Sequence, residues 1–246
     1  MTAQTISELA GEVGAGIRIA VTEAPTDVLG TLTVALDRLR PFPAARLLGV
    51  NGTDLADVPT EVCELDALVT RRRIERDTLR LHQDVRALAA DGALVHRAGL
   101  VWTAAATGSA PSARQLAVAD IGSVDWGNRL AERLERDDRF ASSVSTFDGS
   151  IGIVSGEEQV RFRIYRGRII ETARKSLDGA TFDLTADERT WVELLLGEYD
   201  DYVRFAAKGR FRILGSGFQY LRMTRTVRLM VENCRAMVRE NDADQR

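Results

Sequence analysis

The sequence predicts an α+β protein, with a helix-covered sheet in its C-terminal half and a smaller α/β or α+β unit in its N-terminal half. Between residues 141 and 184, apolar residues recur at every second position, as on half-buried strands. On either side, at 123–134 and 218–239, they recur every three or four residues, as on a helix. The segment 103–115, "TAAATGSAPSARQ", interrupts these patterns with small residues, glycine and proline. We therefore expect two domains, residues 1–110 and 116–240.

The N-terminal half contains several predicted strands. The segment "GIRIAVTEA" alternates Ile17, Ile19 and Val21 as a strand does. The apolar run "ARLLGV" ends at "NGTD", a sequence typical of a turn. Further along, "ALVHRAGLVWTAA" is predicted to form a hairpin that turns at Ala98-Gly99.

Helical spacing is found in two other N-terminal segments. Leu29, Leu32, Leu36 and Leu39 predict a helix that ends before "RPFP". Residues 61–91 form the longest predicted helix, because six apolar residues share one side around the charged run "RRRIERD". These residues are Leu65, Leu68, Ile74, Leu81, Val85 and Leu88.

The strands predicted in the C-terminal half form an antiparallel meander with one apolar face. The runs are "SIGIV", "QVRFRIY", "RIIETA" and "ATFDLT". Arg166-Gly167 lies between the second and third runs and is expected to form a two-residue hairpin loop, in which Gly167 adopts positive φ.

The C-terminal helices are delimited by capping residues. Ser123 is expected to cap a helix, and Thr185 and Glu188 form a capping box that opens a second helix, which ends at Gly197. A short helical stretch follows through Tyr202 and Phe205, and "RFRIL" restarts the strand pattern. The last predicted helix, 218–239, carries one continuous apolar stripe. The stripe consists of Tyr220, Met223, Val227, Met230, Cys234 and Met237.

Residues 121–238 resemble the sterol carrier protein type 2 family. The most family-like pieces are "FDLTADERTWVELLLGE" and, about a dozen residues later, "KGRFRILG". The resemblance implies a five-stranded antiparallel sheet backed by helices, with an apolar tunnel between them that accepts fatty acyl chains, sterols or other lipids. The final helix departs from the family pattern, because it is long and rich in arginine and ends in the polar tail "RENDADQR". The N-terminal half is not covered by the resemblance.

The apolar residues on the inward sides of these elements are the expected ligand contacts. They are Phe162, Ile164, Phe182, Leu184, Trp191, Phe211, Ile213, Tyr220, Met223, Val227 and Met230. The same residues would also fill an ordinary core, but unbranched methionines adapt to apolar ligands of variable shape. Arg210 and Arg212 alternate with Phe211 and Ile213, so we place these arginines at the rim of the tunnel and not inside it.

Charge argues against nucleic acid as a partner. Seven basic and no acidic residues lie between Tyr202 and Arg228, but seven acidic residues and only one arginine lie between Asp183 and Asp201. Neighbouring runs of opposite sign would pair with each other and would not produce the uncompensated positive field that phosphate binding needs. An anionic headgroup, a carboxylate or a transient contact with a membrane surface remains as an alternative partner of the basic run.

No catalytic, metal or cofactor motif is found. His82 and His96 have no HExxH spacing, and no GxSxG accompanies them. Cys63 and Cys234 lie far apart, and "GEVGAG" precedes a strand and lacks the lysine of a phosphate-binding loop. We therefore expect no metal, no cofactor and no catalytic residue, although the enzyme question stays open.

The leading hypothesis is a cytoplasmic protein that binds or carries a hydrophobic small molecule, such as a lipid or a sterol-like or polyketide-like compound. The sequence has no apolar run long enough to span a bilayer and no secretory signal at its N-terminus. One alternative is an enzyme or an enzyme-accessory subunit that acts on a hydrophobic intermediate with a partner enzyme. Another is a homodimeric scaffold that assembles through the stripes at 61–91 and 218–239.

Overall fold

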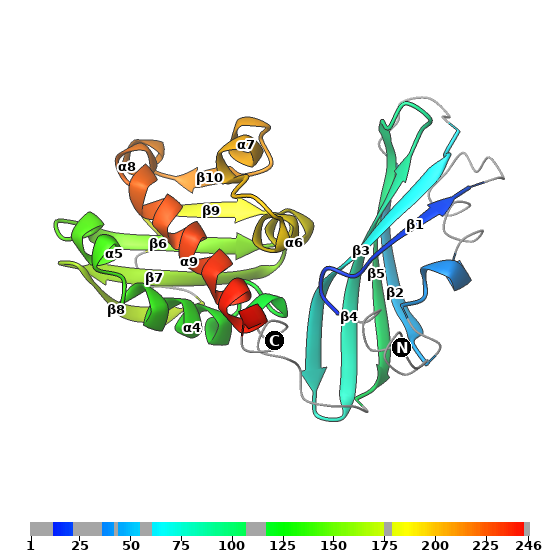
Figure 1. Cartoon of the computed structure of the whole chain (residues 1–246), viewed down its shortest axis with the longest axis horizontal. Coiled ribbons are helices and arrows are strands. Elements are labelled where there is room, and N and C mark those ends of the chain that lie inside the picture. The colour runs from blue at the N-terminus through cyan, green and yellow to red at the C-terminus, as the bar shows by residue number, and fades with distance from the viewer. Residues whose placement is uncertain are drawn as a thin grey trace. The chain divides into compact units, whose positions relative to one another are not determined.

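The computed structural model of the chain divides into two compact units, Met1–Ala110 and Pro111–Arg246, each containing a five-stranded sheet. Figure 1 draws the N-terminal unit in blue to green and the C-terminal unit in green to red. The structure describes residues 12–21, 36–41, 44–54, 61–106, 117–174 and 179–243. The α+β class expected from the sequence is confirmed, and each unit is described by itself below.

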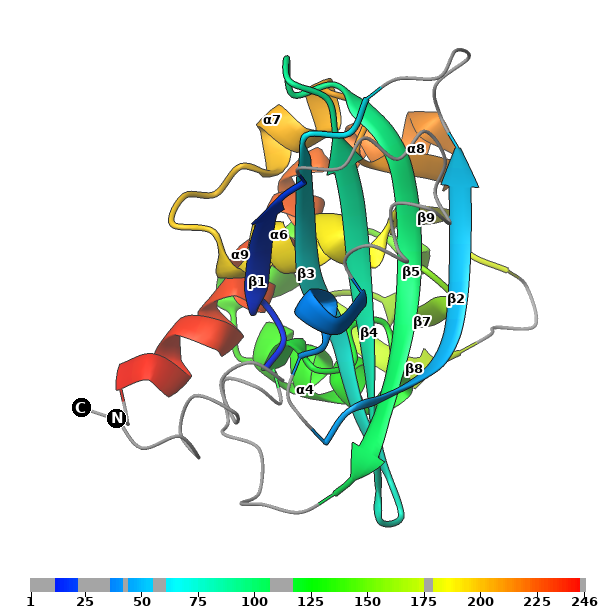
Figure 2. The ribbon, with the colours of Figure 1, turned by 90° about the vertical axis from the view of Figure 1, so that its right-hand side faces the viewer.

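The sheet of the N-terminal unit is antiparallel throughout. Its strands are β1 (Gly16–Ala20), β2 (Arg46–Asp54), β3 (Glu64–Glu75), β4 (Thr78–Leu88) and β5 (Leu94–Ala105). They pair in the order β1-β3-β4-β5-β2, which leaves β1 and β2 at the edges (Figure 2). One face carries the buried core, including Leu65, Leu81 and Leu100. Within this core, Trp102 donates its indole N–H to Gln83 Oε1 at 2.9 Å.

The helix predicted over residues 61–91 is wrong. These residues form the hairpin of β3 and β4, joined by the two-residue loop Arg76-Asp77, in which Arg76 adopts a φ of 56°. The apolar residues meet across neighbouring strands, as Leu65 does with Ala87 and Ala67 with Val85, and do not share a helix face. Leu65, Ala67 and Val69 are buried at every second position, which is the period of a strand. The helix prediction rested on apolar residues spaced more widely than this.

Two predicted turns in this unit are also wrong. Residue Gly99 lies in the middle of β5 and pairs with Asp84 on one side and Asn51 on the other, so no hairpin turns there. The "NGTD" segment continues β2, because Asn51–Asp54 pair with β5. Of the helix expected through Leu29 and Leu39, only residues 36–39 lie among the described residues, and they are helical. The strand predicted at "GIRIAVTEA" is confirmed as β1.

The sheet of the C-terminal unit is antiparallel except at one pairing. Its strands are β6 (Asp148–Ser155), β7 (Glu158–Tyr165), β8 (Arg168–Ala173), β9 (Phe182–Ala186) and β10 (Arg212–Gly215), in the order β10-β9-β6-β7-β8. β6 and β9 run parallel, which the sequence did not indicate. The expected loop at Arg166-Gly167 is confirmed, with φ of 46° and 86°.

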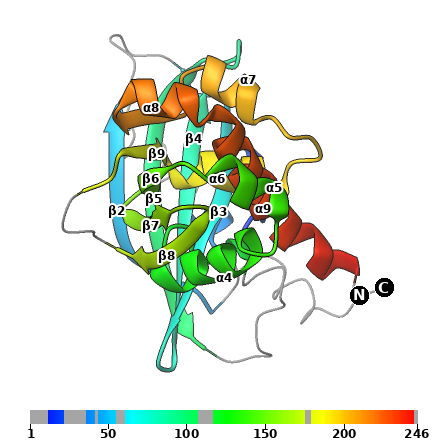
Figure 3. The same ribbon diagram turned by 90° about the vertical axis from the view of Figure 1, so that its left-hand side faces the viewer.

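Six described helices accompany this sheet. They are α4 (Val124–Leu134), α5 (Asp138–Ser143), α6 (Glu188–Leu196), α7 (Tyr202–Ala207), α8 (Gly217–Arg222) and α9 (Thr224–Ala243). Figure 1 shows α9 crossing one face of the sheet, with α4 beside it. Figure 3 shows α5 and α9 on the same side of the sheet. Helices α4, α5 and α9 therefore lie on one face of the sheet.

Capping residues determine where these helices begin. Ser123 caps α4 as expected, its hydroxyl accepting from the Trp126 N–H at 3.2 Å. The capping box at Thr185 is wrong, because Thr185 still pairs with Val154 of the parallel strand β6. Strand pairing thus keeps the backbone extended to Ala186, and Asp187 caps α6 by accepting from the Thr190 N–H at 2.7 Å.

The single helix predicted over 218–239 is interrupted. Helix α8 ends at Arg222, Met223 has left the helical conformation with φ −99° and ψ 14°, and α9 begins at Thr224. The Thr224 hydroxyl donates to Leu221 O at 2.8 Å, a local bond that competes with the helical pattern. The break divides the apolar stripe between two helices.

The outer face of the C-terminal sheet depends on Gly152. A Cβ at this position would overlap Oδ1 of Asp183 and lie 2.9 Å from its Cγ, and Asp183 also pairs with Arg161 at 3.5 Å. We predict that Gly152→Ala lowers the free energy of unfolding by about 1 to 3 kcal/mol, because the added methyl displaces this buried ion pair. Urea unfolding followed by tryptophan fluorescence measures the change, since Trp126 and Trp191 both belong to this unit.

Gly217→Ala is the matched control for this substitution. A Cβ on Gly217 meets no atom within 4 Å and the residue is helical, so stability should stay unchanged or rise slightly. An equal loss of stability in both variants would contradict the role assigned to Gly152.

Candidate functional site

The inner face of the C-terminal sheet presents branched apolar side chains to the helices. Ile151 and Ile153 lie on β6, and Leu184 lies on β9 directly beside Ile153 in the parallel register. Because side chains alternate along a strand, all three project to the same face. All three are buried.

Helix α9 presents a complementary stripe to this face. Val227, Met230, Val231 and Cys234 recur at intervals that place them on one side of a helix. These four side chains are buried as well. The side chains of the sheet and the helix that line this space are therefore apolar.

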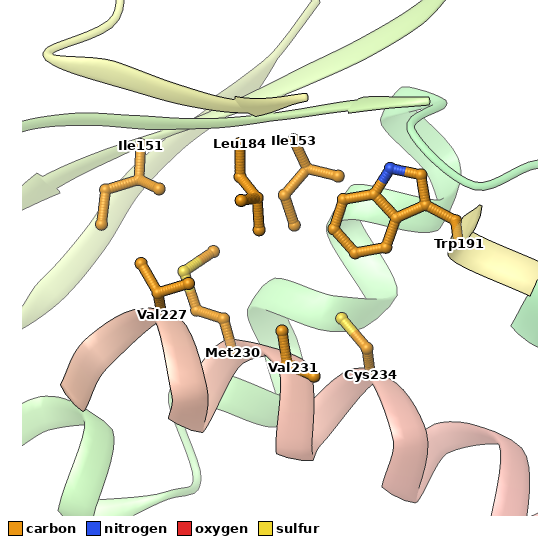
Figure 4. Close-up of a pocket in the computed structure, with 8 residues that line it drawn as sticks. All are labelled: Ile151, Ile153, Leu184, Trp191, Val227, Met230, Val231 and Cys234. Carbon is orange, nitrogen blue, oxygen red and sulfur yellow. The ribbon is translucent and has the colours of Figure 1, made fainter. Parts of the chain in front are cut away.

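A pocket lies between the two layers. It is lined by these seven side chains together with Trp191, and it comprises about 250 Å³ of space, part of it open to solvent. In Figure 4 the three sheet side chains point toward the four helix side chains, and Trp191 lies at one end of the space between them. The indole N–H of Trp191 donates to Val154 O at 2.8 Å, which leaves the ring carbons for the pocket.

Only about 10 Å³ of this space can be occupied by the centre of a water-sized sphere, which is room for about one water molecule. The empty pocket is therefore far smaller than most small-molecule sites, which measure roughly 300 to 1,000 Å³. A ligand with a long chain or several rings would therefore have to displace lining side chains. Met230 is suited to this, because its unbranched side chain has several rotatable bonds.

The residues predicted to contact a ligand fall into three groups. Leu184, Trp191, Val227 and Met230 line the pocket. Phe162, Ile164, Phe182, Phe211 and Met223 are buried but do not line it, and Ile213 and Tyr220 are half-buried. Their role in binding stays a prediction.

Four lining residues were missed from the sequence: Ile151, Ile153, Val231 and Cys234. The alternation in "SIGIV" indicated a strand, but it did not show that β6 lies at the centre of the sheet beside β9. Cys234 belongs to the predicted stripe but is not among the expected ligand contacts. Val231 directly follows Met230, so it falls outside the spacing of three or four residues that defines the predicted stripe.

Phe211 belongs to an aromatic cluster beside the pocket. Its ring makes edge contacts with Trp191 at 5.0 Å and with Tyr202 at 5.3 Å between centroids. The Tyr202 and Tyr220 hydroxyls lie 2.9 Å apart, and Tyr220 makes an edge contact with Phe182. Burial, reinforced by the hydrogen bond with the Tyr220 hydroxyl, raises the pKa of Tyr202, so the phenol stays neutral at physiological pH. The cluster connects α7 and α8 to the sheet.

The two arginines placed at the rim have different surroundings. Arg210 donates to Glu193 Oε2 at 2.6 Å and to Thr190 Oγ1 at 3.1 Å, and its guanidinium lies 4.0 Å from the centroid of the Phe205 ring. Its charge is therefore already paired within the protein. Arg212 is exposed on β10. Neither side chain lines the pocket.

Glu193 is the centre of an ion-pair network. It accepts from Arg189 at 2.7 Å as well as from Arg210. Burial acts to raise the pKa of this carboxyl, but the hydrogen bonds from the two arginines outweigh it, so the pKa lies below its ordinary value. The network fastens the segment before β10 to helix α6.

The pocket contains no group suited to acid–base or nucleophilic chemistry. Among the eight lining side chains only Trp191 and Cys234 carry a polar hydrogen, and the indole N–H is already bonded. Burial raises the pKa of the Cys234 thiol, so the reactive thiolate is disfavoured. His82 and His96 lie on the N-terminal sheet. Within the described ranges, no three His, Cys, Asp or Glu side chains are grouped so as to hold a metal ion.

Comparison with known proteins adds neighbours of low similarity. No family model matches the chain, and a search of curated proteins finds no match. A crystal structure of sterol carrier protein 2 matches at 16% identity with a TM-score of 0.41, over 47% of this chain and 98% of that chain. A conserved hypothetical protein of Thermus thermophilus, described as possibly a sterol carrier protein, also matches at 16% identity and a TM-score of 0.41, over 53% and 94%.

A hot-dog-like protein from Thermanaerovibrio acidaminovorans matches at 12% identity with a TM-score of 0.29, over 41% of this chain and 87% of that chain. Sterol carrier protein structures are thus among the structural neighbours of the chain, as the resemblance of residues 121–238 predicts, and they are accompanied by a hot-dog fold.

The two cysteines offer a direct test of how well the Cys234 side of the pocket is shielded from solvent. We predict that 5,5′-dithiobis(2-nitrobenzoate) modifies Cys234 in a Cys63→Ser protein at least about tenfold more slowly than it modifies Cys63 in a Cys234→Ser protein. The reason is that Cys234 is buried with a raised pKa, whereas Cys63 is half-buried. Similar rates in the two native proteins would show that the pocket is open to solvent, whereas both thiols should react quickly in urea.

The Glu193 network predicts a pH dependence of stability. Folding lowers the pKa of Glu193, so its ionised carboxyl stabilises the folded state. This stabilisation is complete at pH values above the ordinary glutamate pKa of about 4.3 and is lost as the pH falls through the lower pKa of the folded state. We predict that Glu193→Gln lowers the free energy of unfolding by about 1 to 3 kcal/mol at pH 7 and by much less in strong acid. Urea unfolding at several pH values measures the difference between wild type and variant.

Glu232→Gln is the control for this effect, because Glu232 pairs with Arg139 at 3.0 Å but is exposed to solvent. Loss of this ion pair should lower the free energy of unfolding by less than about 1 kcal/mol. A Glu193→Gln effect that stays constant with pH would contradict the assigned ion pairs.

Proposed function

We propose that the C-terminal unit binds a hydrophobic small molecule, a lipid or a sterol-like or polyketide-like compound, between its sheet and helix α9. The observation that carries the proposal is the apolar pocket formed by β6, β9, Trp191 and α9. The resemblance of residues 121–238 to sterol carrier proteins favours the same ligand class. Carriage of the ligand between sites is part of the proposal.

Binding would be driven by the removal of apolar surface from water. Each methylene group buried in such a pocket contributes roughly 0.8 kcal/mol before the costs of association. Because the lining offers no charged group, the affinity should depend on the apolar body of the ligand and little on its polar end. A carboxylate or hydroxyl would lie at an opening of the pocket, in water.

The lining supports binding and not turnover. The Cys234 thiol has a raised pKa, and the Trp191 N–H is committed to Val154 O. A ligand held among these eight side chains would meet no proton donor or nucleophile of suitable pKa. We therefore favour a carrier over an enzyme for this unit.

Filling the pocket should abolish uptake. We predict that Val231→Phe weakens binding of a fluorescent fatty acid such as cis-parinaric acid by at least about tenfold, because the added ring occupies the space that the ligand needs. Fluorescence titration measures the dissociation constant.

The matched control is Val238→Phe. Val238 is buried on the same helix seven residues later but does not line the pocket, so the variant carries a similar packing strain and should retain uptake. Uptake that is unchanged in Val231→Phe, or lost equally in both folded variants, would contradict the proposed site. Native mass spectrometry of protein purified from its own host would identify a co-purifying ligand.

A further inference from the structure

Two large apolar side chains stand exposed on helix α8. Phe218 and Leu221 are 68% and 70% exposed. No residue of α8 is buried. Single exposed apolar residues are common, but two that lie about one helical turn apart expose a continuous apolar surface.

The anchoring of α8 determines which side faces outward. Tyr220 is half-buried and contacts Phe182 and the Tyr202 hydroxyl, so this side of the helix faces the protein. Phe218 and Leu221 are three residues apart and lie on a common side of the helix. The Arg222 guanidinium lies 5.7 Å from the Phe218 ring centroid, so a cation accompanies the apolar groups.

The same segment carries unpaired positive charge. Of the seven basic residues between Tyr202 and Arg228, Arg204 pairs with Asp201 and Arg210 pairs with Glu193. The other five are exposed, and none forms an ion pair with any residue that the structure describes. They are Lys208, Arg212, Arg222, Arg225 and Arg228. Since no acidic residue lies in this stretch, its positive charge is uncompensated locally.

We propose that this α8 surface, formed by Phe218 and Leu221 with Arg222 and Arg225, binds the surface of an anionic lipid bilayer. Protruding apolar side chains enter the boundary between headgroups and acyl chains, while arginines beside them attract anionic headgroups. No helix in the described part of the chain is both long and apolar enough to cross a bilayer, so the contact would be peripheral.

Charge distinguishes this occupant from a second copy of the chain. A symmetric dimer through the α8 surface would bring two sets of unpaired arginines together, and like charges at an interface are unfavourable. A bilayer also needs no complementary shape, which suits a short helix whose apolar side chains stand out into solvent. An anionic bilayer satisfies both the apolar and the charged groups.

The inference goes beyond the proposed function, because binding to a bilayer does not require a ligand in the pocket. It also gives the pocket a location relative to the bilayer. Met223 joins α8 directly to α9, and Val227, one turn later, lines the pocket. A bilayer in contact with α8 would therefore lie near the end of α9 that begins the pocket.

The test is sedimentation of the full chain with vesicles of phosphatidylcholine, with or without phosphatidylserine. We expect the wild-type protein to bind the vesicles that contain phosphatidylserine, and to bind them more weakly as salt is added. Phe218→Ser combined with Leu221→Ser should weaken binding at least tenfold. Arg222→Gln combined with Arg225→Gln should weaken it to a similar extent and remove most of its salt dependence.

The control is Ile170→Ser, which removes an equally exposed apolar residue, 60% accessible, from the opposite edge strand β8. Binding like the wild type is expected of this variant. The proposal is wrong if the wild-type chain does not sediment with the anionic vesicles, if the Phe218 and Leu221 variant binds unchanged, or if neutral vesicles bind equally well. It is also wrong if size-exclusion chromatography shows that the wild-type protein is a dimer, that the Phe218 and Leu221 variant is a monomer, and that the wild-type protein does not bind vesicles.

The vesicle assay and the fatty acid titration fail independently. A Val231→Phe protein that has lost uptake should still bind anionic vesicles, because the α8 surface is intact. Conversely, the Phe218 and Leu221 variant should still bind cis-parinaric acid in the absence of vesicles.

Discussion

Burial of the apolar face of the C-terminal sheet by helix α9 is the packing constraint on which the rest of this unit depends. Ile151, Ile153 and Leu184 project from one face because strands alternate, so a helix with a matching stripe has to cover them. Arg235 holds α9 in place by donating to Leu194 O and Gly197 O, carbonyls at the end of α6 that lack helical partners. The position of α9 thereby also fixes α6, and with it Trp191.

The pocket follows from how these layers meet. Branched side chains on the sheet oppose Val227, Met230 and Cys234 on the helix, and short or flexible groups leave space that a larger aliphatic side chain would fill. The other face of the same sheet carries the ion pair of Arg161 and Asp183. The apolar pocket lies on the side that α9 covers.

The sequence predicted the C-terminal unit better than the N-terminal one, for a physical reason. Local signals there were unambiguous, as at Ser123 and at the Arg166-Gly167 loop, whereas the parallel pairing of β6 with β9 joins segments far apart in the chain. In the N-terminal unit the β3–β4 hairpin turns at Arg76-Asp77, which lacks the glycine or asparagine typical of such loops. Because the sequence indicates no turn between the two strands, their apolar residues read as one segment with the spacing of a helix. The lining residues on β6 were missed because their place in the sheet depends on pairing.

The break at Met223 connects the pocket to the surface. An uninterrupted helix over 218–239 would have continued the apolar stripe of α9 along the sheet. Because the chain leaves the helical conformation at Met223, α8 takes its own direction, held by Tyr220, and Phe218 and Leu221 face solvent. Large apolar groups exposed in this way are unfavourable for an isolated monomer, and natural chains depart from local stability rules mainly where a site requires it. The exposed helix is connected by one residue, Met223, to the helix that lines the pocket, so the exposed surface and the pocket belong to neighbouring segments of the chain.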